Sequence, residues 1–309
     1  MKIYKKIWGR WRDFRLTQDE WFMAVCKSYS NPSVSVNGKL LPKFPDEQIQ
    51  INTTGQAGSA TLKEAFIFYR DCVETFESLG APLKPDALLL DFGVGWGRIA
   101  RFFLRNLPLE NIHGLDVMQE FVQICRQTFS SNNFYITPPY PPSSLPENKF
   151  NFIVGYSVFS HLSEDACCQW MGEFHRILAP GGMVALTTRG RPFFDYCESL
   201  KGKAQNDYQK SLATMFDDFA AARMAYDRGE FVHSNKEGVN GGGAMTSDFY
   251  GETFIPEAYA RSSYNKLFVL EKFLFDPVRQ THPIMFFRRI DNCDSLPVVG
   301  TQAIDAPCG

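Results

Sequence analysis

Three closely spaced glycines, Gly93, Gly95 and Gly97, follow the apolar segment 88–92 and precede a helix-like stretch. Glycine adopts positive φ angles and lets the backbone approach a ligand where a Cβ atom would collide with it. Exposed N–H groups at the start of the following helix can bind a carboxylate. A dinucleotide site would need its third glycine at position 98, where this sequence has Arg98. The spacing therefore disfavours a pyrophosphate ligand.

An acidic residue stands where a nucleoside site would need one. Asp116 ends the next strand-like segment, 112–116, and in nucleotide-binding α/β folds an acid at this place accepts hydrogen bonds from ribose hydroxyls. A glycine cluster alone is often an ordinary tight turn. The glycines and Asp116 together predict that the chain binds a ligand containing a nucleoside.

One histidine lies where a general base would be useful. His161 falls in the loop 156–162, which follows a strand-like segment, and such loops open at the carboxyl edge of a sheet, where ligands bind. Imidazole accepts a proton near neutral pH, so one interpretation makes His161 a general base. The other makes it a loop residue that caps the next helix or holds the backbone. A later irregular stretch has four more polar groups that could face a substrate: His233, Asp248, Tyr250 and Glu252.

The elements that must position these groups alternate between strand-like and helix-like patterns. We expect strands over 87–92, 112–116, 134–137, 152–156 and 183–188. We expect helices over 97–104, 119–129 and 163–178. This alternation predicts a doubly wound α/β fold, in which a mostly parallel sheet has helices on both faces.

Three regions lie outside this rhythm. Residues 1–85 are expected to form an N-terminal cap of helices and loops, with helices over 19–29 and 61–79. Residues 86–309 would then form the Rossmann-like domain, within which 190–263 reads as an insertion with a polar helix near 205–228. Two final strand-like segments, 267–275 and 283–289, follow each other across a short turn. They predict a C-terminal antiparallel hairpin that closes the sheet.

Composition narrows the class of protein. The 309 residues are 44% hydrophobic with a formal net charge of −2, so the chain can bury a large core and has no global basic field to attract nucleic acid. The eight cysteines include no Cys-x-x-Cys pair and no Cys/His ligand spacing, which predicts no metal site. The sequence has no secretion signal and no apolar run near the roughly 18 residues of a membrane span. These features predict a cytoplasmic protein.

Two aromatic features keep two interpretations each. The basic and aromatic N-terminus, 1–16, could lie on a membrane or nucleic acid, or pack as an amphipathic helix over the ligand site. Trp96, inside the glycine loop, could stack on a ligand or pack against the N-terminal helices. Pattern alone does not separate these alternatives.

Four motifs together resemble the class I S-adenosylmethionine-dependent methyltransferases. They are Asp-Phe-Gly-Val-Gly-Trp-Gly at 91–97, Gly-Leu-Asp at 114–116, Phe-Asn-Phe-Ile-Val at 150–154, and Phe-His-Arg-Ile-Leu-Ala-Pro-Gly-Gly at 174–182. The resemblance covers roughly 61–189 and the final hairpin, and it implies a seven-stranded sheet and S-adenosylmethionine as the cofactor. In place of an acidic residue near adenine after the third strand, this chain has Ile-Thr-Pro-Pro-Tyr at 136–140. The adenine contact is therefore unassigned.

The same resemblance implies roles for individual residues. The three glycines would surround the methionine part of the cofactor, Asp116 would bind the ribose, and Met118 would lie against adenine. Tyr156 and Ser157 would sit beside the methyl group. The cofactor-binding residues expected in this way are Asp91, Gly93, Gly95, Gly97, Asp116, Met118, Tyr156 and Ser157.

These expectations combine into one leading hypothesis, an O-methyltransferase acting on a small-molecule or glycan hydroxyl. His161 would be its catalytic base, and the insertion 190–263 would shape the acceptor pocket without adding much to cofactor binding. One alternative keeps the cofactor but methylates an amine or a carboxylate, for which a base is not always needed. Another is a methyltransferase-like fold that only binds.

Overall fold

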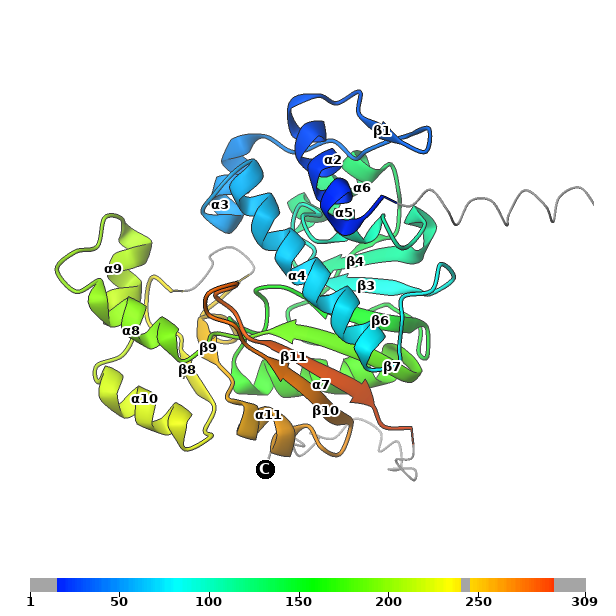
Figure 1. Ribbon diagram of the computed structural model, residues 1–309. Coiled ribbons are helices and arrows are strands. Elements are labelled where there is room, and N and C mark those ends of the chain that lie inside the picture. The colour runs from blue at the N-terminus through cyan, green and yellow to red at the C-terminus, as the bar shows by residue number, and fades with distance from the viewer. Residues whose placement is uncertain (1–15, 240–244, 292–309) are drawn as a thin grey trace, which may run out of the picture.

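A seven-stranded sheet forms the centre of the computed structural model, which describes residues 16–239 and 245–291 (Figure 1). Its strand order is β10-β11-β7-β6-β3-β4-β5. The strands are β3 (Leu89–Phe92), β4 (Ile112–Asp116), β5 (Phe134–Ile136), β6 (Phe150–Gly155), β7 (Leu178–Thr187), β10 (Phe268–Leu274) and β11 (Ile284–Arg289). Strands β7, β6, β3, β4 and β5 run parallel, whereas β11 is antiparallel to both β7 and β10. The predicted fold class, including the C-terminal hairpin, is confirmed.

Helices cover both faces of this sheet because successive strand side chains point to opposite faces. One face buries side chains such as Leu89, Val154 and Phe286 against four helices: α2 (Gln18–Ser30), α4 (Ser59–Ser78), α5 (Ala100–Phe103) and α6 (Gln119–Phe129). The other face buries the alternate side chains, such as Leu90 and Ile153, against α7 (Glu164–Ile177) and α11 (Glu257–Ser263). The chain therefore has the layered arrangement that the alternating pattern predicted.

Two element boundaries differ from the expectation by three residues or more. The helix predicted from residue 97 begins at Ala100, because Gly97 has a φ of +80° and cannot lie inside a right-handed helix. The strand predicted from 183 begins at Leu178. Leu178 is buried and pairs with Phe150, so the chain becomes extended directly after α7, before the Pro-Gly-Gly segment 180–182.

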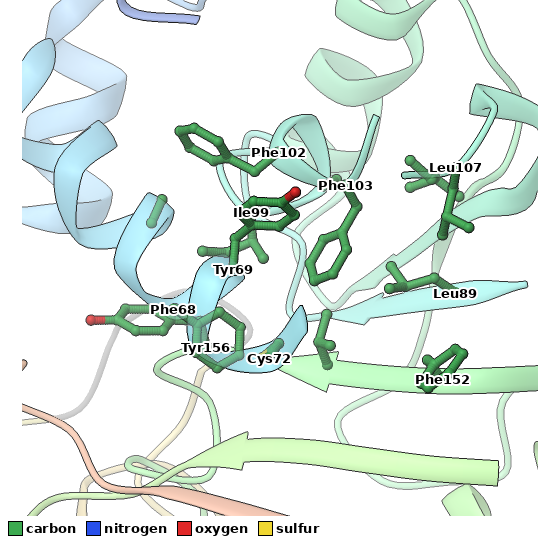
Figure 2. Close-up of a cluster of buried hydrophobic side chains, with 14 of the residues drawn as sticks. Phe68, Tyr69, Cys72, Leu89, Ile99, Phe102, Phe103, Leu107, Phe152 and Tyr156 are labelled. Atoms are coloured by element: carbon green, nitrogen blue, oxygen red, sulfur yellow. The ribbon is translucent and has the colours of Figure 1, made fainter. Parts of the chain in front are cut away.

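The N-terminal region shares a core with the sheet. Phe68 and Cys72 of α4 lie near Tyr156 in the buried cluster of Figure 2, which also contains Leu89 and Phe152 of the sheet. The Phe68 and Tyr156 rings are 5.0 Å apart between centroids. The region also contains elements that the pattern did not predict: a small hairpin of β1 (Ser35–Val36) and β2 (Lys39–Leu40), and the helix α3 (Glu47–Thr54).

The insertion forms a lobe beside the sheet (Figure 1) with its own apolar cluster. Its elements are α8 (Pro192–Ser199), α9 (Asp207–Thr214), α10 (Phe219–Asp227), β8 (Val232–Ser234) and β9 (Glu252–Phe254). The single helix expected over 205–228 is two helices, because the side chain of Asp218 accepts hydrogen bonds from the N–H groups of Ala220 and Ala221 and so begins a new helix. Strands β8 and β9 pair antiparallel and bring 252–254 back toward the main sheet.

Candidate functional site

A cavity of about 460 Å³ lies at the carboxyl edge of the parallel strands. Its wall includes Gly93 and Gly95 after β3, Asp116 at the end of β4, and Ser157 and His161 after β6. Parallel strands present their carboxyl ends at one edge of a sheet, so loops distant in sequence meet there. Of the predicted site residues, seven lie on this wall: Gly93, Gly95, Asp116, Met118, Tyr156, Ser157 and His161.

Two further segments complete the wall. Helix α3 contributes Asn52, Thr53 and Thr54, and the last part of the insertion contributes Met245, Phe249 and Tyr250. The insertion therefore lines the same cavity as the glycine loop. That the insertion shapes the acceptor pocket without adding much to cofactor binding stays a prediction.

Of the glycines on the cavity wall, Gly95 has the most free space beside its backbone. It has a φ of +52°, and a Cβ atom built there would meet no protein atom within 4 Å. Gly97 differs, because a Cβ atom there would lie 2.4 Å from Cε2 of Phe129. A ligand can thus lie against the backbone at Gly95, whereas Gly97 permits close packing of α6 on the loop.

Asp116 holds the glycine loop and faces the cavity at the same time. Its Oδ2 accepts a hydrogen bond from the N–H of Gly95 at 2.8 Å, and its Oδ1 accepts one from the N–H of Met118 at 2.9 Å. Burial raises the pKa of Asp116 to about 6, while the backbone hydrogen bonds act in the opposite direction. Each carboxylate oxygen has a second lone pair, so the group can still accept hydrogen bonds from a ligand's hydroxyls.

Asp91 and Gly97 are the two predicted cofactor residues that do not lie on the cavity wall. The Oδ2 atom of Asp91 accepts the N–H of Ala100 at 3.0 Å at the start of α5. Burial raises the pKa of Asp91 to about 8. Both residues therefore shape the loop from behind, and direct contact with a ligand in this cavity is not available to them.

Thr137 is a wall residue that the sequence did not single out. It follows β5, at the place where the family resemblance left the adenine contact unassigned, and its Oγ1 is buried without a hydrogen-bond partner. A buried hydroxyl without a partner is costly, which suggests that a ligand completes its hydrogen bonding. The only sequence signal was its position directly after the third strand.

Arg98 is the single arginine or lysine among the described residues of the cavity wall. Its Nη1 donates to Oε2 of Glu64 at 2.6 Å and to the carbonyl oxygen of Thr61 at 3.1 Å. Its guanidinium carbon lies 5.1 Å from the centre of the Tyr156 ring. These contacts hold a positive charge at the wall, where it can attract an anionic group of a ligand.

Trp96 packs against N-terminal elements. Its indole Nε1 donates to Oγ1 of Thr53 in α3 at 3.1 Å, and its ring is tilted against Phe44 with centroids 6.2 Å apart. The side chain is buried and also forms part of the cavity wall. Of the two interpretations of Trp96, packing against the N-terminal region is the one the structure supports.

His161 has one ring nitrogen anchored and the other directed toward Ser157. Nδ1 lies 2.7 Å from the carbonyl oxygen of Gly251, which can only accept, so Nδ1 carries the proton. Nε2 is then the unprotonated nitrogen, 3.3 Å from Oγ of Ser157. Burial is the main cause that lowers the pKa of His161. At neutral pH the ring is therefore a neutral proton acceptor on the wall of the cavity.

The other polar candidates of the insertion occupy different environments. Tyr250 lies on the wall, but Asp248 is exposed and does not line the cavity. Glu252 is completely buried, with Oε2 2.7 Å from Nε of Arg189. Because Glu252 is held in this ion pair, it is not available as a substitute base. The Nδ1 atom of His233 is bonded to Oγ1 of Thr253 at 2.7 Å.

Further sequence expectations concern metals, membranes and the N-terminus. Within 16–239 and 245–291 no group of three or more His, Cys, Asp or Glu side chains is arranged to hold a metal ion. None of the helices in these ranges has the length and apolar character needed to cross a membrane. The basic and aromatic segment lies, except for Leu16, outside the described residues.

Comparison with known protein families gives one match. Residues 90–184 match the family model described as "Methyltransferase domain". That range contains the glycine loop, Asp116 and His161, and it precedes the insertion. No match was found among curated proteins.

The chain also resembles solved structures to which its sequence identity is low. One is the magnesium protoporphyrin IX methyltransferase from Synechocystis PCC 6803 with bound SAH, at 12% identity and a TM-score of 0.48, covering 79% of this chain and 94% of that one. Another is an S-adenosylmethionine dependent methyltransferase from Mesorhizobium loti, at 12% identity and a TM-score of 0.42, covering 71% and 99%. The family match and the sheet order together show that residues 90–184 form a methyltransferase domain within an α/β methyltransferase fold.

Proposed function

We propose that the protein is an S-adenosylmethionine-dependent O-methyltransferase whose acceptor is a hydroxyl of a small molecule or glycan. One observation carries this proposal. The unprotonated Nε2 of His161 faces Ser157 on the wall of the cavity that also contains Gly95 and Asp116. A proton acceptor thus lies in the same cavity as the groups suited to the cofactor.

The residues of the cavity fit the chemical groups of the cofactor. The open backbone at Gly95 would accommodate its methionine part, and Arg98 would attract its carboxylate. Asp116 would accept hydrogen bonds from the ribose hydroxyls, and Met118 would lie against adenine. The hydroxyl of Thr137 would find its missing partner on the adenine ring.

The bound cofactor supplies an electrophilic methyl group on a sulfonium, and the protein must align the acceptor with it and remove the acceptor's proton. A hydroxyl is a weak nucleophile while it keeps its proton, which is why a base matters for this acceptor. Nε2 of His161 would take that proton while Nδ1–H remains directed at the carbonyl oxygen of Gly251. The lowered pKa of His161 keeps the ring neutral and able to act as a base near pH 7.

The insertion and helix α3 would shape the acceptor side of the cavity, since both contribute to its wall. The low net charge of −2 favours a small-molecule or glycan acceptor over a nucleic acid. A cytoplasmic location stays a prediction from the sequence.

The acceptor and the base are tested together. Purified protein is incubated with labelled S-adenosylmethionine and fractionated cell extract, and the labelled product is identified by mass spectrometry. With that product in hand, His161→Gln should lower kcat by about 10²–10⁴-fold, the usual contribution of a positioned base, while calorimetry shows unchanged binding of S-adenosylhomocysteine.

The matched control is His175→Gln, which changes a histidine of α7 that bonds to the carbonyl oxygen of Ile290, away from the cavity wall. Its kcat should match that of the unmodified chain. If His161→Gln keeps near-normal turnover at saturating acceptor, the base assignment fails. A product methylated on an amine or carboxylate would overturn the hydroxyl assignment.

A further inference from the structure

Three consecutive residues of the insertion hold His161. The ring of Tyr250 stacks on the imidazole with centroids 4.9 Å apart and planes 2° from parallel. The carbonyl oxygen of Gly251 accepts the Nδ1 proton, and Oε1 of Glu252 lies 3.6 Å from Nδ1. The ring is thus fixed in its plane, in its tautomer and beside a negative charge, all by a segment about 90 residues away in sequence.

Glu252 is an unusual residue to bury. Its side chain is 0% exposed, and it is held by Nε of Arg189 at 2.7 Å and by the hydroxyl of Tyr208, which donates to Oε1 at 2.6 Å. Removing both charges of an ion pair from water costs as much free energy as their attraction often returns, and apolar side chains frequently replace such pairs without loss of stability. Stability alone is therefore a weak explanation for this pair.

We propose that Glu252 is a positioning residue for proton transfer, which stabilises the positive charge that forms on His161 when its Nε2 takes the acceptor's proton. This inference rests on the proposed function. In the step, the proton moves from the acceptor oxygen to Nε2, and an electron pair of that oxygen forms the new bond to the methyl carbon. The pair of the methyl–sulfur bond stays on sulfur. The imidazolium then keeps both N–H groups, with Nδ1–H between Gly251 and Glu252.

The groups around His161 shift its pKa in opposite directions. Glu252 raises the pKa of His161, whereas burial and Arg189 lower it, with burial the largest cause. The other titratable rings nearby, His233 and His282, both have lowered pKa values and stay neutral near pH 7. The ring is therefore neutral at rest, while a carboxylate lies close enough to stabilise the transient cation.

The insertion consequently does more than surround an acceptor. Glu252 lies outside 90–184, the range that matches the methyltransferase family model, and reaches His161 because β9 pairs with β8 and its end bonds to the 160–161 loop. That connection is made by the N–H groups of Gly251 and Thr253, which donate to the carbonyl oxygens of His161 and Ser160 at 2.7 and 2.8 Å. The insertion thus completes the catalytic apparatus built on the shared fold.

The test measures the pKa of His161 in the full chain by NMR of nitrogen-15-labelled histidine, with the His161→Gln spectrum used to identify the signal. Glu252→Gln keeps the shape of the side chain and removes its charge, so the pKa of His161 should fall further below its ordinary value. A merely structural role would have the opposite effect, because a loosened and hydrated ring regains a pKa near the usual value of about 6.5. The matched control is Glu237→Gln, an exposed glutamate of the same insertion, which should leave the His161 pKa unchanged.

Kinetics supply the second readout. We expect Glu252→Gln to lower kcat by about 10- to 100-fold, part of what a positioned base contributes, and to move the acid limb of the kcat profile to lower pH. Binding of S-adenosylhomocysteine should stay the same. Glu252→Asp, which keeps the charge, should recover part of the rate.

A second variant keeps the test possible if Glu252→Gln leaves Arg189 unpaired and the chain unfolds. The double variant Arg189→Met with Glu252→Gln removes both buried charges. Because Glu252 affects the pKa of His161 more than Arg189 does, this variant should also lower that pKa. An unchanged or raised pKa in the folded variants overturns the inference. If His161→Gln abolishes turnover while Glu252→Gln does not alter it, only the positioning role fails. If His161→Gln keeps turnover, the base assignment in the proposed function fails, and the positioning role fails with it.

Discussion

Alanine substitutions at two neighbouring glycines separate ligand contact from loop packing. Gly95 and Gly97 both have positive φ angles, +52° and +80°, and alanine in that region costs about 1–2 kcal/mol. At Gly95 the added methyl group would meet no protein atom within 4 Å. The free energy of unfolding of Gly95→Ala should therefore fall by only that backbone cost.

Gly97→Ala adds a steric cost. Its methyl group would lie 2.4 Å from Cε2 of Phe129 and 3.3 Å from Sγ of Cys125. Phe129 is buried and packs on Phe134 with centroids 5.2 Å apart, so it cannot move aside freely. Overpacking of this kind costs about 1–3 kcal/mol, which brings the expected total for Gly97→Ala to about 2–5 kcal/mol.

Ligand binding should show the reverse order. The Gly95→Ala methyl group enters the space that we assign to the cofactor, so the Kd for S-adenosylhomocysteine should rise at least about 10-fold, which corresponds to about 1.4 kcal/mol. Gly97→Ala, measured where it is folded, should bind nearly as well as the unmodified chain. Urea unfolding without ligand and titration calorimetry give the two quantities.

Two results would refute this reasoning. If Gly95→Ala binds S-adenosylhomocysteine with full affinity, the backbone at Gly95 does not contact the ligand. If the two variants lose the same stability, the close packing on Phe129 is not the reason for glycine at position 97.

Three further predictions concern individual side chains. Asp116→Ala should weaken S-adenosylhomocysteine binding by about 1.5–3 kcal/mol, the range for hydrogen bonds to a charged group, and unchanged affinity in calorimetry would remove Asp116 from the ribose site. Thr137→Val should weaken the same binding by about 0.5–1.5 kcal/mol without loss of stability, because it removes a buried hydroxyl that has no protein partner; equal affinity would exclude an adenine contact. Burial raises the pKa of Asp91 to about 8 in the folded chain, above its unfolded value of about 3.9. The contribution of Asp91 to the free energy of unfolding is therefore fully present below about pH 4 and is lost as pH rises through about 8. Asp91→Asn lacks this dependence, and urea unfolding at pH 5 and pH 8 should show the unmodified chain losing stability relative to the variant; a constant difference would contradict the raised pKa.

Short-range sequence patterns predicted the sheet and much of the cavity wall. Gly95, Asp116 and His161 were recognised because each lies at the end of a strand or in the loop after it, and the carboxyl ends of parallel strands necessarily meet at one edge. The sequence pattern was less accurate where two local signals competed. At Asp218 the helical pattern is continuous, but the side chain caps a new helix and divides the expected helix in two.

Only the tertiary structure showed which side chains line the cavity and which lie outside its wall. Asp91 looked like a ligand contact in sequence, but its carboxylate bonds to the start of α5, away from the cavity wall. Glu252 looked in sequence like a polar group that could face a substrate, but it is buried in an ion pair beside His161. Local periodicity carries no information about the contacts of Glu252, since Arg189 lies 63 residues away and the His161 loop about 90 residues away. Both contacts depend on how the β8–β9 pair packs on the loop after β6. The sequence by itself therefore determined the fold and the position of His161, while long-range packing determined what holds that histidine and which charges surround it.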